Sequence, residues 1–379
     1  MRFVFISTMS GHRWGGSEEL WSQAALRLHE EGHEVSASVV WWPQLSPNVL
    51  ALKERGIKLS VRKLPRHHAA PLRAWHTLKR QFNFEAETAK WLRRQRPDLI
   101  VVSQGGNLDG LECMKFCREA NLPFVSIVQC NYEEWWPADD TWREMVAVYR
   151  AAKQVFCVSR HNLELLENQI GEPLPQAAVV WNPFNVPAGQ PPVWPAEKNI
   201  WKLACVARLE PAAKGQDLLF QVLSRPQWQD RPVELNLYGA GPGVDNLKRL
   251  IGKLNLKKVY LRGHVNDVKA IWEQNHLLVL PSRYEGLPLA LVEAMWCGRP
   301  AVVTDVGGSA EICADGETGF VAAAPTVDLV GAALERAWNR RDDWQRIGQA
   351  ARARVEQLIP KNPVLNFCQQ LMAGAENEK

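Results

Sequence analysis

Short apolar runs and helix-length segments alternate along most of this 379-residue chain, and this alternation constrains the fold more than any other feature. The runs at Leu99–Val102, Phe124–Val128 and Val155–Val158 are almost continuously apolar, as in parallel strands that helices cover on both faces. The same order opens the chain, with a strand over Arg2–Ser7 and a helix over Ser17–Glu31. We therefore predict a doubly wound α/β domain.

A proline-rich segment interrupts the alternation once. It holds five prolines between Asn182 and Pro195 and has no apolar periodicity. The alternation then restarts and includes strands expected at Leu277–Leu280 and Ala301–Thr304. We predict a Rossmann-like N-terminal domain over 1–182, a linker over 183–197 and a second Rossmann-like domain over 198–359. Residues 360–379 are expected to contain a helix, and its return to the N-terminal domain is left open.

Charge and composition exclude several other classes of protein. The net charge of +4 is too small to indicate nucleic-acid binding. No apolar run approaches the roughly 18–20 residues that a membrane helix needs, and the apolar N-terminus turns polar too soon for a signal peptide. The eight cysteines include no CxxC pair, so we expect core thiols and neither a structural metal nor a disulfide framework. No cofactor is expected. The expected compartment is the cytoplasm.

One region is strongly basic. Eight Lys and Arg residues and no acidic residue lie between Arg55 and Phe84. Such a region in the first domain can bind a phosphorylated or lipid-linked acceptor, or touch the anionic inner face of a membrane. The alternative is a positive surface that only water contacts.

The segment from Glu285 to Glu293, EGLPLALVE, carries the strongest chemical signal. Pro288 fits the first position of a helix, and the free N–H groups of a helix start form an anion site suited to a diphosphate. Glu293 lies about 8 Å beyond Glu285 along the helix axis. The two carboxylates can therefore hydrogen-bond hydroxyl groups at the two ends of one ligand, unless they only cap the helix and face solvent.

This segment resembles the E-x7-E signature of the retaining GT-B glycosyltransferases of family 4, and the resemblance extends over nearly the whole chain. It implies two Rossmann-like domains facing a central cleft, with the nucleotide-sugar donor on the second and the acceptor on the first. It also implies that Glu285 contacts the donor sugar and Glu293 the nucleotide ribose. The residues expected around the helix start of this donor site are Gly286, Leu287, Pro288 and Leu289.

Other segments match the family in the same order. VARLEPAAKGQD places Arg208 and Lys214 after a strand, and two cations there can neutralise a diphosphate leaving group. The alternative is a solvated basic pair. The TDVGGSAEI segment resembles the final glycine loop, to which we assign no direct chemical role. YGAGPG and RGHVNDV resemble the loops beside the nucleotide and its base, which points to Gly239, Gly241, His264 and Val265.

The loop SGHRWGGSEE after the first strand matches the N-terminal donor loop of the family. Gly15 and Gly16 would let the backbone approach the donor closely, and Ser17 is expected to cap the next helix. The spacing is not that of the dinucleotide fingerprint G-x-G-x-x-G, which disfavours a nicotinamide cofactor.

The sequence departs from the family after the strand at Phe124–Val128, where many members carry a histidine. Gln129, Cys130 and Asn131 stand there instead, so no general base is assigned. His12 is a candidate substitute, although a loop histidine is more often incidental. The aromatic and acidic cluster that follows could bind an acceptor or be a packed loop. The candidate acceptor residues are His12, Gln129, Asn131 and Trp135.

Together these features predict a retaining, metal-independent hexosyltransferase. A UDP-sugar donor is favoured and GDP-mannose is the alternative. The expected acceptor is a glycan, as in polysaccharide biosynthesis, a lipid-linked sugar or a small molecule. Two other readings stay open: a non-catalytic scaffold that binds sugar nucleotides, and a GT-B nucleotide-sugar 2-epimerase.

Overall fold

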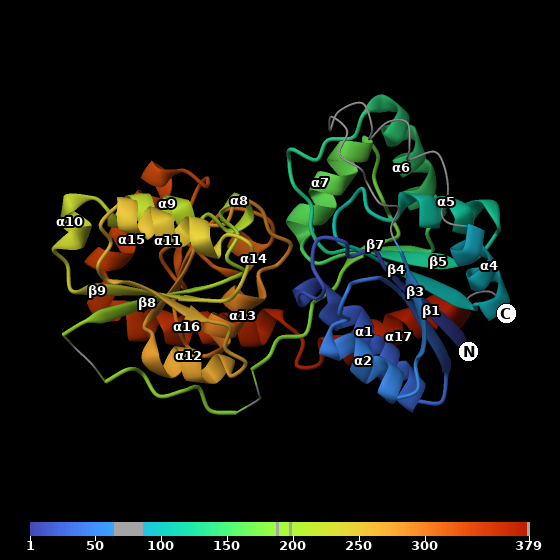
Figure 1. Cartoon of the computed structure of the whole chain (residues 1–379), viewed down its shortest axis with the longest axis horizontal. Coiled ribbons are helices and arrows are strands. Elements are labelled where there is room, and N and C mark those ends of the chain that lie inside the picture. The colour runs from blue at the N-terminus through green and yellow to red at the C-terminus, as the bar shows by residue number, and fades with distance from the viewer. Residues whose placement is uncertain (64–85, 187–188, 197–198, 377–379) are drawn as a thin grey trace. The chain divides into compact units, whose positions relative to one another are not determined.

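The computed structural model describes residues 1–63, 86–186, 189–196 and 199–376 (Figure 1). The chain forms two compact units, Met1–Pro183 with Asn362–Lys379, and Phe184–Lys361. Each unit contains one sheet, and all paired strands run parallel. The predicted α/β class, with two Rossmann-like units, is therefore confirmed. In the described ranges, no helix is long and apolar enough to cross a bilayer.

The first sheet has the strand order β3-β2-β1-β4-β5-β6-β7. Side chains of β1 alternate between two cores: Phe3 and Phe5 join one, and Val4 and Ile6 join the other. Burial on both faces explains why this strand has a continuously apolar sequence. The strands are β1 (Arg2–Ser7), β2 (Glu34–Val40), β3 (Lys58–Arg62), β4 (Leu99–Gln104), β5 (Phe124–Val128), β6 (Gln154–Cys157) and β7 (Ala177–Val179).

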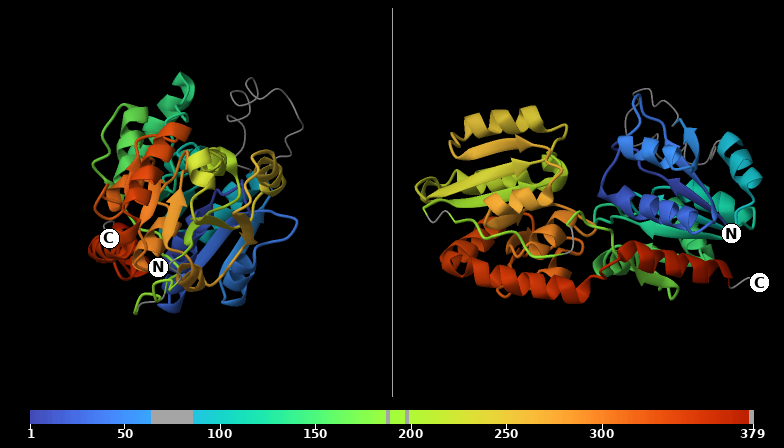
Figure 2. Two further views of the ribbon diagram at one scale, coloured as in Figure 1. Left: turned by 90° about the vertical axis from the view of Figure 1, so that its left-hand side faces the viewer. Right: turned by 90° about the horizontal axis from the view of Figure 1, so that it is seen from below.

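Helices cover both faces of this sheet (Figures 1 and 2). The core behind Phe3 includes side chains of α1, α2 and α17, and the core behind Val4 includes those of α4, α5, α6 and α7. The C-terminal helix α17 packs in the first unit, where the Phe367 ring meets Phe156 edge-on at 5.2 Å. The bounds are α1 (Glu19–Glu30), α2 (Pro47–Glu54), α4 (Ala86–Gln95), α5 (Leu111–Glu119), α6 (Asp139–Ala151), α7 (Arg160–Ile170) and α17 (Pro363–Glu376).

The second sheet has the order β10-β9-β8-β11-β12-β13. Its strands are β8 (Trp201–Val206), β9 (Val233–Tyr238), β10 (Val259–Gly263), β11 (Leu277–Leu280), β12 (Ala301–Thr304) and β13 (Phe320–Ala322). Among the helices of the second unit, α9 packs against α15, and α13 packs against α16. The helices are α8 (Pro211–Lys214), α9 (Gln216–Leu223), α10 (Pro226–Gln229), α11 (Val244–Lys253), α12 (Val268–Gln274), α13 (Leu289–Trp296), α14 (Ser309–Ile312), α15 (Val327–Asn339) and α16 (Trp344–Leu358).

The proline-rich segment is packed against the second unit. The Arg299 side chain is 2% exposed, and its Nη2 donates to the carbonyl oxygens of Val193, at 2.8 Å, and Pro192, at 3.4 Å. Its guanidinium carbon lies 4.9 Å from the centroid of the Trp194 ring. The second unit accordingly begins at Phe184 in the structure, whereas the sequence analysis predicts that the second domain begins at residue 198. Arg299 also donates to the carbonyl oxygens of Trp272, Asn275 and Cys297.

Candidate functional site

The second sheet reverses its winding direction between β8 and β11, which are neighbours. In open α/β sheets ligands bind beyond the carboxyl ends of strands at such a switch point. The loop after β8 carries Arg208 and Lys214, and the loop after β11 carries Glu285. The strand order therefore brings the three predicted catalytic residues to the carboxyl ends of two neighbouring central strands of the second sheet.

Lys214 and Glu285 are in direct contact. The Lys214 Nζ donates to the Glu285 Oε1 at 2.6 Å, and the Ser282 hydroxyl donates to the same oxygen at 2.7 Å. Both charged side chains are mostly buried, so bulk water screens this pair little. Ser282 is itself held, because its carbonyl oxygen accepts from the Thr304 hydroxyl at 2.5 Å. The carboxylate thus has a defined position at the end of β11.

Backbone contacts join the two loops. Arg283 N donates to the carbonyl oxygen of Ala213 at 2.8 Å, and its guanidinium binds both carboxylate oxygens of Asp217 at 2.7 and 2.8 Å. Gly215, between α8 and α9, has φ +63°, and a Cβ there would lie 1.9 Å from the carbonyl oxygen of Pro281. The sequence showed no sign of the Arg283–Asp217 pair, because the two residues are 66 positions apart.

Arg208 lies two residues after the end of β8 and beside a carboxylate. Its Nε donates to the Glu210 Oε2 at 2.6 Å, and its carbonyl oxygen accepts from the Gln216 side chain at 2.8 Å. A single turn, α8, then begins at Pro211 and ends at Lys214. Both cations therefore border the same short loop, with Arg208 at its start and Lys214 at its end.

The predicted helix start is real but begins one residue later. Pro288 has an extended conformation, φ −70° and ψ 112°, and is the N-cap of α13. Its carbonyl oxygen accepts from the N–H groups of Leu291 and Val292. The N–H groups of Leu289 and Ala290 precede these and have no partner inside the helix, as at any helix start. They are available to an anion, whereas Leu287 lies outside the helix and its side chain is buried.

The glycine loop after β12 supports the turn at Glu285 and Gly286. Gly308 N donates to the carbonyl oxygen of Gly286 at 2.7 Å. Gly307 has φ +52°, and a Cβ on it would lie 2.3 Å from the carbonyl oxygen of Glu285. This loop therefore has a structural role that its sequence did not reveal: it packs against the backbone of Glu285, the residue expected to bind the sugar.

Glu293 lies in α13 and is buried. Its Oε1 accepts from the backbone N–H of Asn185 at 3.0 Å. Glu293, the residue predicted to bind the ribose, is therefore hydrogen-bonded to the start of the proline-rich segment. The two residues are 108 positions apart in the chain.

The glycines of YGAGPG fit tightly against the loop after β8. Gly239 has φ +142°, and a Cβ there would lie 2.1 Å from the carbonyl oxygen of Ala207. A Cβ on Gly241 would lie 2.5 Å from the carbonyl oxygen of Leu209. Close backbone packing is thus sufficient to explain both glycines. His264 directly follows the edge strand β10; it is exposed and bonds the Asn266 side chain at 3.0 Å, and the next residue, Val265, is half-buried.

In the first unit, the switch point lies between β1 and β4, and the Gly15–Gly16 loop follows β1. No neighbour approaches a Cβ built on Gly15 more closely than 3.8 Å, so packing within the described residues does not explain this glycine. Ser17 lies inside the short 3-10 helix Gly16–Glu18, and the N-cap of α1 is Glu18, which makes no side-chain cap bond. The predicted Ser17 cap is therefore wrong.

Two of the candidate acceptor residues are buried. The Gln129 Oε1 accepts from Asn182 at 2.7 Å, and Asn131 donates to the Gln169 Oε1 at 2.8 Å. Among the residues described, the Gln129 Nε2 and the Asn182 Oδ1 have no hydrogen-bond partner. Trp135 is half-buried and meets Tyr132 edge-on at 5.9 Å, whereas Trp136 is 60% exposed, so only part of the aromatic cluster is packed. His12 is half-buried in the loop after β1.

A buried carboxyl group, that of Glu18, was not singled out by sequence reasoning. The Ser7 hydroxyl donates to its Oε2 at 2.7 Å. Burial raises the pKa of Glu18 from its ordinary value of 4.5 to about 7. The position of Glu18 two residues after the Gly-Gly pair was the available signal.

Comparison with known proteins gives matches over most of the chain. The model of Glycosyltransferase Family 4 matches residues 14–186, and that of Glycosyl transferases group 1 matches residues 190–354. A segment of 118 residues, 31% of this chain, is 31% identical to poly(ribitol-phosphate) alpha-N-acetylglucosaminyltransferase of Staphylococcus aureus. Another of 142 residues, 35% of the chain, is 30% identical to GDP-mannose-dependent alpha-(1-6)-phosphatidylinositol monomannoside mannosyltransferase of Mycolicibacterium smegmatis. The chain spans 24% and 37% of the lengths of these two relatives.

A solved structure resembles the whole chain. It is that of Anabaena HepE in complex with UDP, with a TM-score of 0.74, 19% identity and 100% of each chain covered. At this identity the similarity concerns the fold.

Proposed function

Because the chain belongs to the group 1 (family 4) glycosyltransferases and has the GT-B fold, we propose that it transfers a hexose from a nucleoside diphosphate sugar with retention of anomeric configuration. The observation that carries the proposal is the contact of Lys214 with Glu285 at the switch point of the second sheet, next to the free N–H groups at the start of α13. Cation, carboxylate and helix start are the groups that a diphosphate and a sugar hydroxyl need.

In this proposal Arg208 and Lys214 neutralise the departing diphosphate, together with the N–H groups of Leu289 and Ala290. Glu285 orients the sugar and Glu293 binds the ribose. These charges take the place of a metal ion, so transfer should continue in excess EDTA. Loss of activity in EDTA would contradict the proposed metal independence.

UDP-sugars are the favoured donors, and GDP-mannose remains the alternative, since one matched relative is named as GDP-mannose-dependent. A thermal-shift panel of UDP, GDP and ADP sugars tests this choice, because a ligand that binds only the folded state raises the melting temperature. The anomeric proton signal of the product tests retention.

The decisive variant is Glu285→Ala. Removing the group that orients the sugar should lower kcat at least about a hundredfold, as for other single transition-state contacts, while nucleoside diphosphate binding persists. Glu317→Ala removes an exposed carboxylate of the same unit and should leave both unchanged. Wild-type activity in Glu285→Ala would remove the proposed role. Binding without turnover over varied acceptors would favour a scaffold, and conversion of the donor sugar to its C2 epimer would favour an epimerase.

For the acceptor, we propose an anionic or lipid-linked glycan. The two curated relatives are named for poly(ribitol-phosphate) and a phosphatidylinositol mannoside. In the Arg55–Phe84 stretch, residues 64–85 lie outside the described residues, and Arg62 donates to Ser7 and Ser38 within the fold. The basic surface that the structure does describe follows this stretch, on and just after α4, and consists of Lys90, Arg93, Arg94 and Arg96, all exposed.

Among the described residues, none of these four cations forms an ion pair. Each cation near an anionic membrane contributes about 1 kcal/mol of attraction. Co-sedimentation at low salt should therefore recover the protein with phosphatidylglycerol vesicles and not with phosphatidylcholine vesicles. If the protein sediments with neither kind of vesicle, the proposed membrane contact is wrong. A soluble anionic acceptor then remains as the proposal.

A further inference from the structure

Both hydrogen-bond donors to the Glu285 carboxylate reach the same oxygen atom. The Lys214 Nζ and the Ser282 hydroxyl lie 2.6 and 2.7 Å from Oε1. A carboxylate oxygen offers two lone-pair positions, and these two donors fill both positions on Oε1. Among the residues that the structure describes, no donor binds Oε2. The carboxylate is therefore saturated at one oxygen and unpaired at the other.

The unpaired Oε2 belongs to a side chain that is only 11% exposed. A mostly buried carboxylate oxygen that lacks a hydrogen bond is costly, and it can be satisfied only by a group that donates, such as a hydroxyl. Glu285 follows β11, whose neighbour β8 lies across the switch point of the sheet. Because ligands bind at this point of such sheets, the unpaired oxygen lies where a donor group of a ligand is expected.

Ser282 is held in place from two strands. It is 1% exposed and follows Pro281 at the end of β11. Its carbonyl oxygen accepts from the Thr304 hydroxyl at 2.5 Å, and Thr304 is the last residue of β12. The Ser282 hydroxyl then donates to the Glu285 carboxylate. This series of bonds starts on rigid elements, so it fixes the rotation of the carboxyl group and decides which oxygen stays unpaired.

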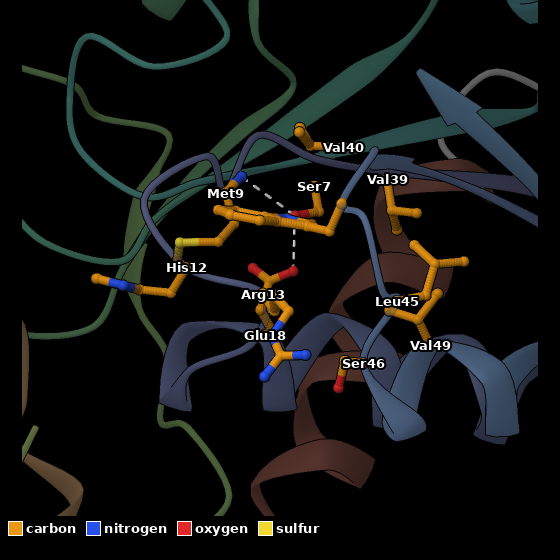
Figure 3. Close-up of a pocket in the computed structure, with 11 residues that line it drawn as sticks. Ser7, Met9, His12, Arg13, Glu18, Val39, Val40, Leu45, Ser46 and Val49 are labelled. Atoms are coloured by element: carbon orange, nitrogen blue, oxygen red, sulfur yellow. Dashed lines mark hydrogen bonds between the residues drawn. The ribbon is translucent and has the colours of Figure 1, made fainter. Parts of the chain in front are cut away.

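A similar serine–glutamate bond in the first unit shows what distinguishes Ser282. Ser7, the last residue of β1, donates to the Glu18 Oε2 at 2.7 Å (Figure 3). Glu18 is 5% exposed, and the pocket beside it has a volume of about 10 Å³, the space of one water molecule. That pocket is too small for a sugar. A serine bonded to a buried glutamate therefore does not by itself indicate a ligand, whereas the switch point and the unpaired oxygen at Glu285 do.

We propose that Ser282 is a positioning residue for the donor sugar: together with Lys214 it occupies Oε1 of Glu285, so that Oε2 accepts from a hydroxyl group of the sugar. This inference rests on the proposed function, because the sugar is that of the nucleotide donor. Ser282 does not touch the ligand and acts only through Glu285. Its hydroxyl thereby determines how strictly the site requires a sugar that carries this hydroxyl group.

The action of Ser282 on Glu285 can be tested without a ligand. Urea unfolding of the second unit is compared for the wild type, Ser282→Ala, Glu285→Ala and the double variant. We expect the two effects on the free energy of unfolding to be non-additive, because the double variant loses the hydrogen bond only once. Additive effects would overturn the proposal.

The role in recognition is tested by hydrolysis of UDP-glucose and its monodeoxy analogues, or of the GDP-mannose series if the thermal-shift panel selects that donor. The wild type should reject at least one analogue, which lacks the hydroxyl that Oε2 binds. In Ser282→Ala the carboxyl group can rotate, so kcat/KM for the complete sugar should fall about ten- to a hundredfold, as for other hydrogen bonds to charged groups. For the rejected analogue kcat/KM should not change. The dissociation constant of the nucleoside diphosphate, which has no sugar, should also stay the same.

Two further variants separate this role from a general loss of packing. Ser282→Cys has a similar size and a weaker donor, so its kcat/KM should lie between those of the wild type and Ser282→Ala. It also takes the place of Ser282→Ala if that variant fails to fold. Thr318→Ala is the matched control, since it removes a buried hydroxyl of the same unit that bonds the Ala314 backbone. It should leave kcat/KM and the discrimination between sugars unchanged.

The remaining outcomes contradict distinct statements. An equal fall in kcat/KM for the complete sugar and for every monodeoxy analogue would mean that Ser282 supports the unit as a whole, and the positioning role would be wrong. Weaker binding of the nucleoside diphosphate to Ser282→Ala would have the same meaning. If no nucleotide sugar binds or is hydrolysed, the proposed function is wrong and the role of Ser282 with it, while the unfolding data still decide whether Ser282 acts on Glu285.

Discussion

At the scale of single residues, the Lys214–Glu285 contact depends on the glycine between α8 and α9. Gly215 has a left-handed backbone conformation and lies against the carbonyl oxygen of Pro281, at the end of β11. Lys214 is adjacent to this point on one loop, and Ser282 on the other. The close approach of two backbones, which only glycine permits here, thus brings the cation to the carboxylate.

Gly215→Ala should destabilise the second unit by about 3 kcal/mol or more, since backbone strain adds to a collision at 1.9 Å with the Pro281 carbonyl oxygen. Gly316→Ala is the matched control: its φ is +75° and nothing lies within 4 Å of the added Cβ, so only strain of about 1 kcal/mol remains. Urea unfolding followed by tryptophan fluorescence measures both. Equal losses would show that the Pro281 contact contributes nothing.

At the scale of elements, α17 belongs to the core of the first unit although it ends the chain. Its apolar side chains join the cluster that contains α1 and the Phe3 face of the sheet. An amphipathic segment at a chain end has several faces on which it could pack, so its sequence predicted a helix but not its place. The complementary apolar face that α1 and the sheet leave open decides that place.

Phe367→Ala should lower the free energy of unfolding of the first unit by about 3–5 kcal/mol, because a buried aromatic ring is removed and a cavity remains. The ring is 1% exposed and contacts Phe156. Leu358→Ala, at the end of α16, removes a side chain that is 40% exposed and should change stability by less than about 1 kcal/mol. Urea unfolding again provides the comparison, and similar losses for the two variants would be incompatible with a core role for α17.

At the scale of the whole molecule, the chain passes between the units at Pro183–Phe184 and at Lys361–Asn362. The segment after the first passage is held by Arg299 and also donates the Asn185 N–H to Glu293. Burial lowers the pKa of Arg299 to about 10, so this side chain is still a cation at neutral pH. Its charge is satisfied by carbonyl oxygens rather than by a carboxylate, which suits the fork of a guanidinium.

Arg299→Met should free this segment, because its carbonyl oxygens lose their donors, and should make residues 184–195 accessible to thermolysin under native conditions. Arg299→Lys keeps the charge with a single donor group and should give intermediate cleavage. Mass spectrometry of the fragments locates the cuts. Cleavage of Arg299→Met at the wild-type rate would show that other contacts are enough to hold the segment.

The sequence by itself determined the class of fold and the main chemical candidates. Strands buried on both faces of a parallel sheet must be continuously apolar, so Leu99–Val102 and Leu277–Leu280 were predictable from local composition. The segment Glu285–Glu293 was equally local, because a strand end, a turn and a helix start follow one another within it. The short strands β3, β7 and β13 were missed, since three to five residues at or near a sheet edge carry little pattern.

Only the tertiary structure decided which distant residues meet. Lys214 and Glu285 are 71 positions apart, and their contact follows from β8 and β11 being neighbours in the sheet, which local pattern does not encode. The same holds for the Ser7–Glu18 bond, whose importance comes from burial, and for the tie between Asn185 and Glu293. Burial and proximity are properties of the packed chain, whereas periodicity and turn chemistry are properties of its segments.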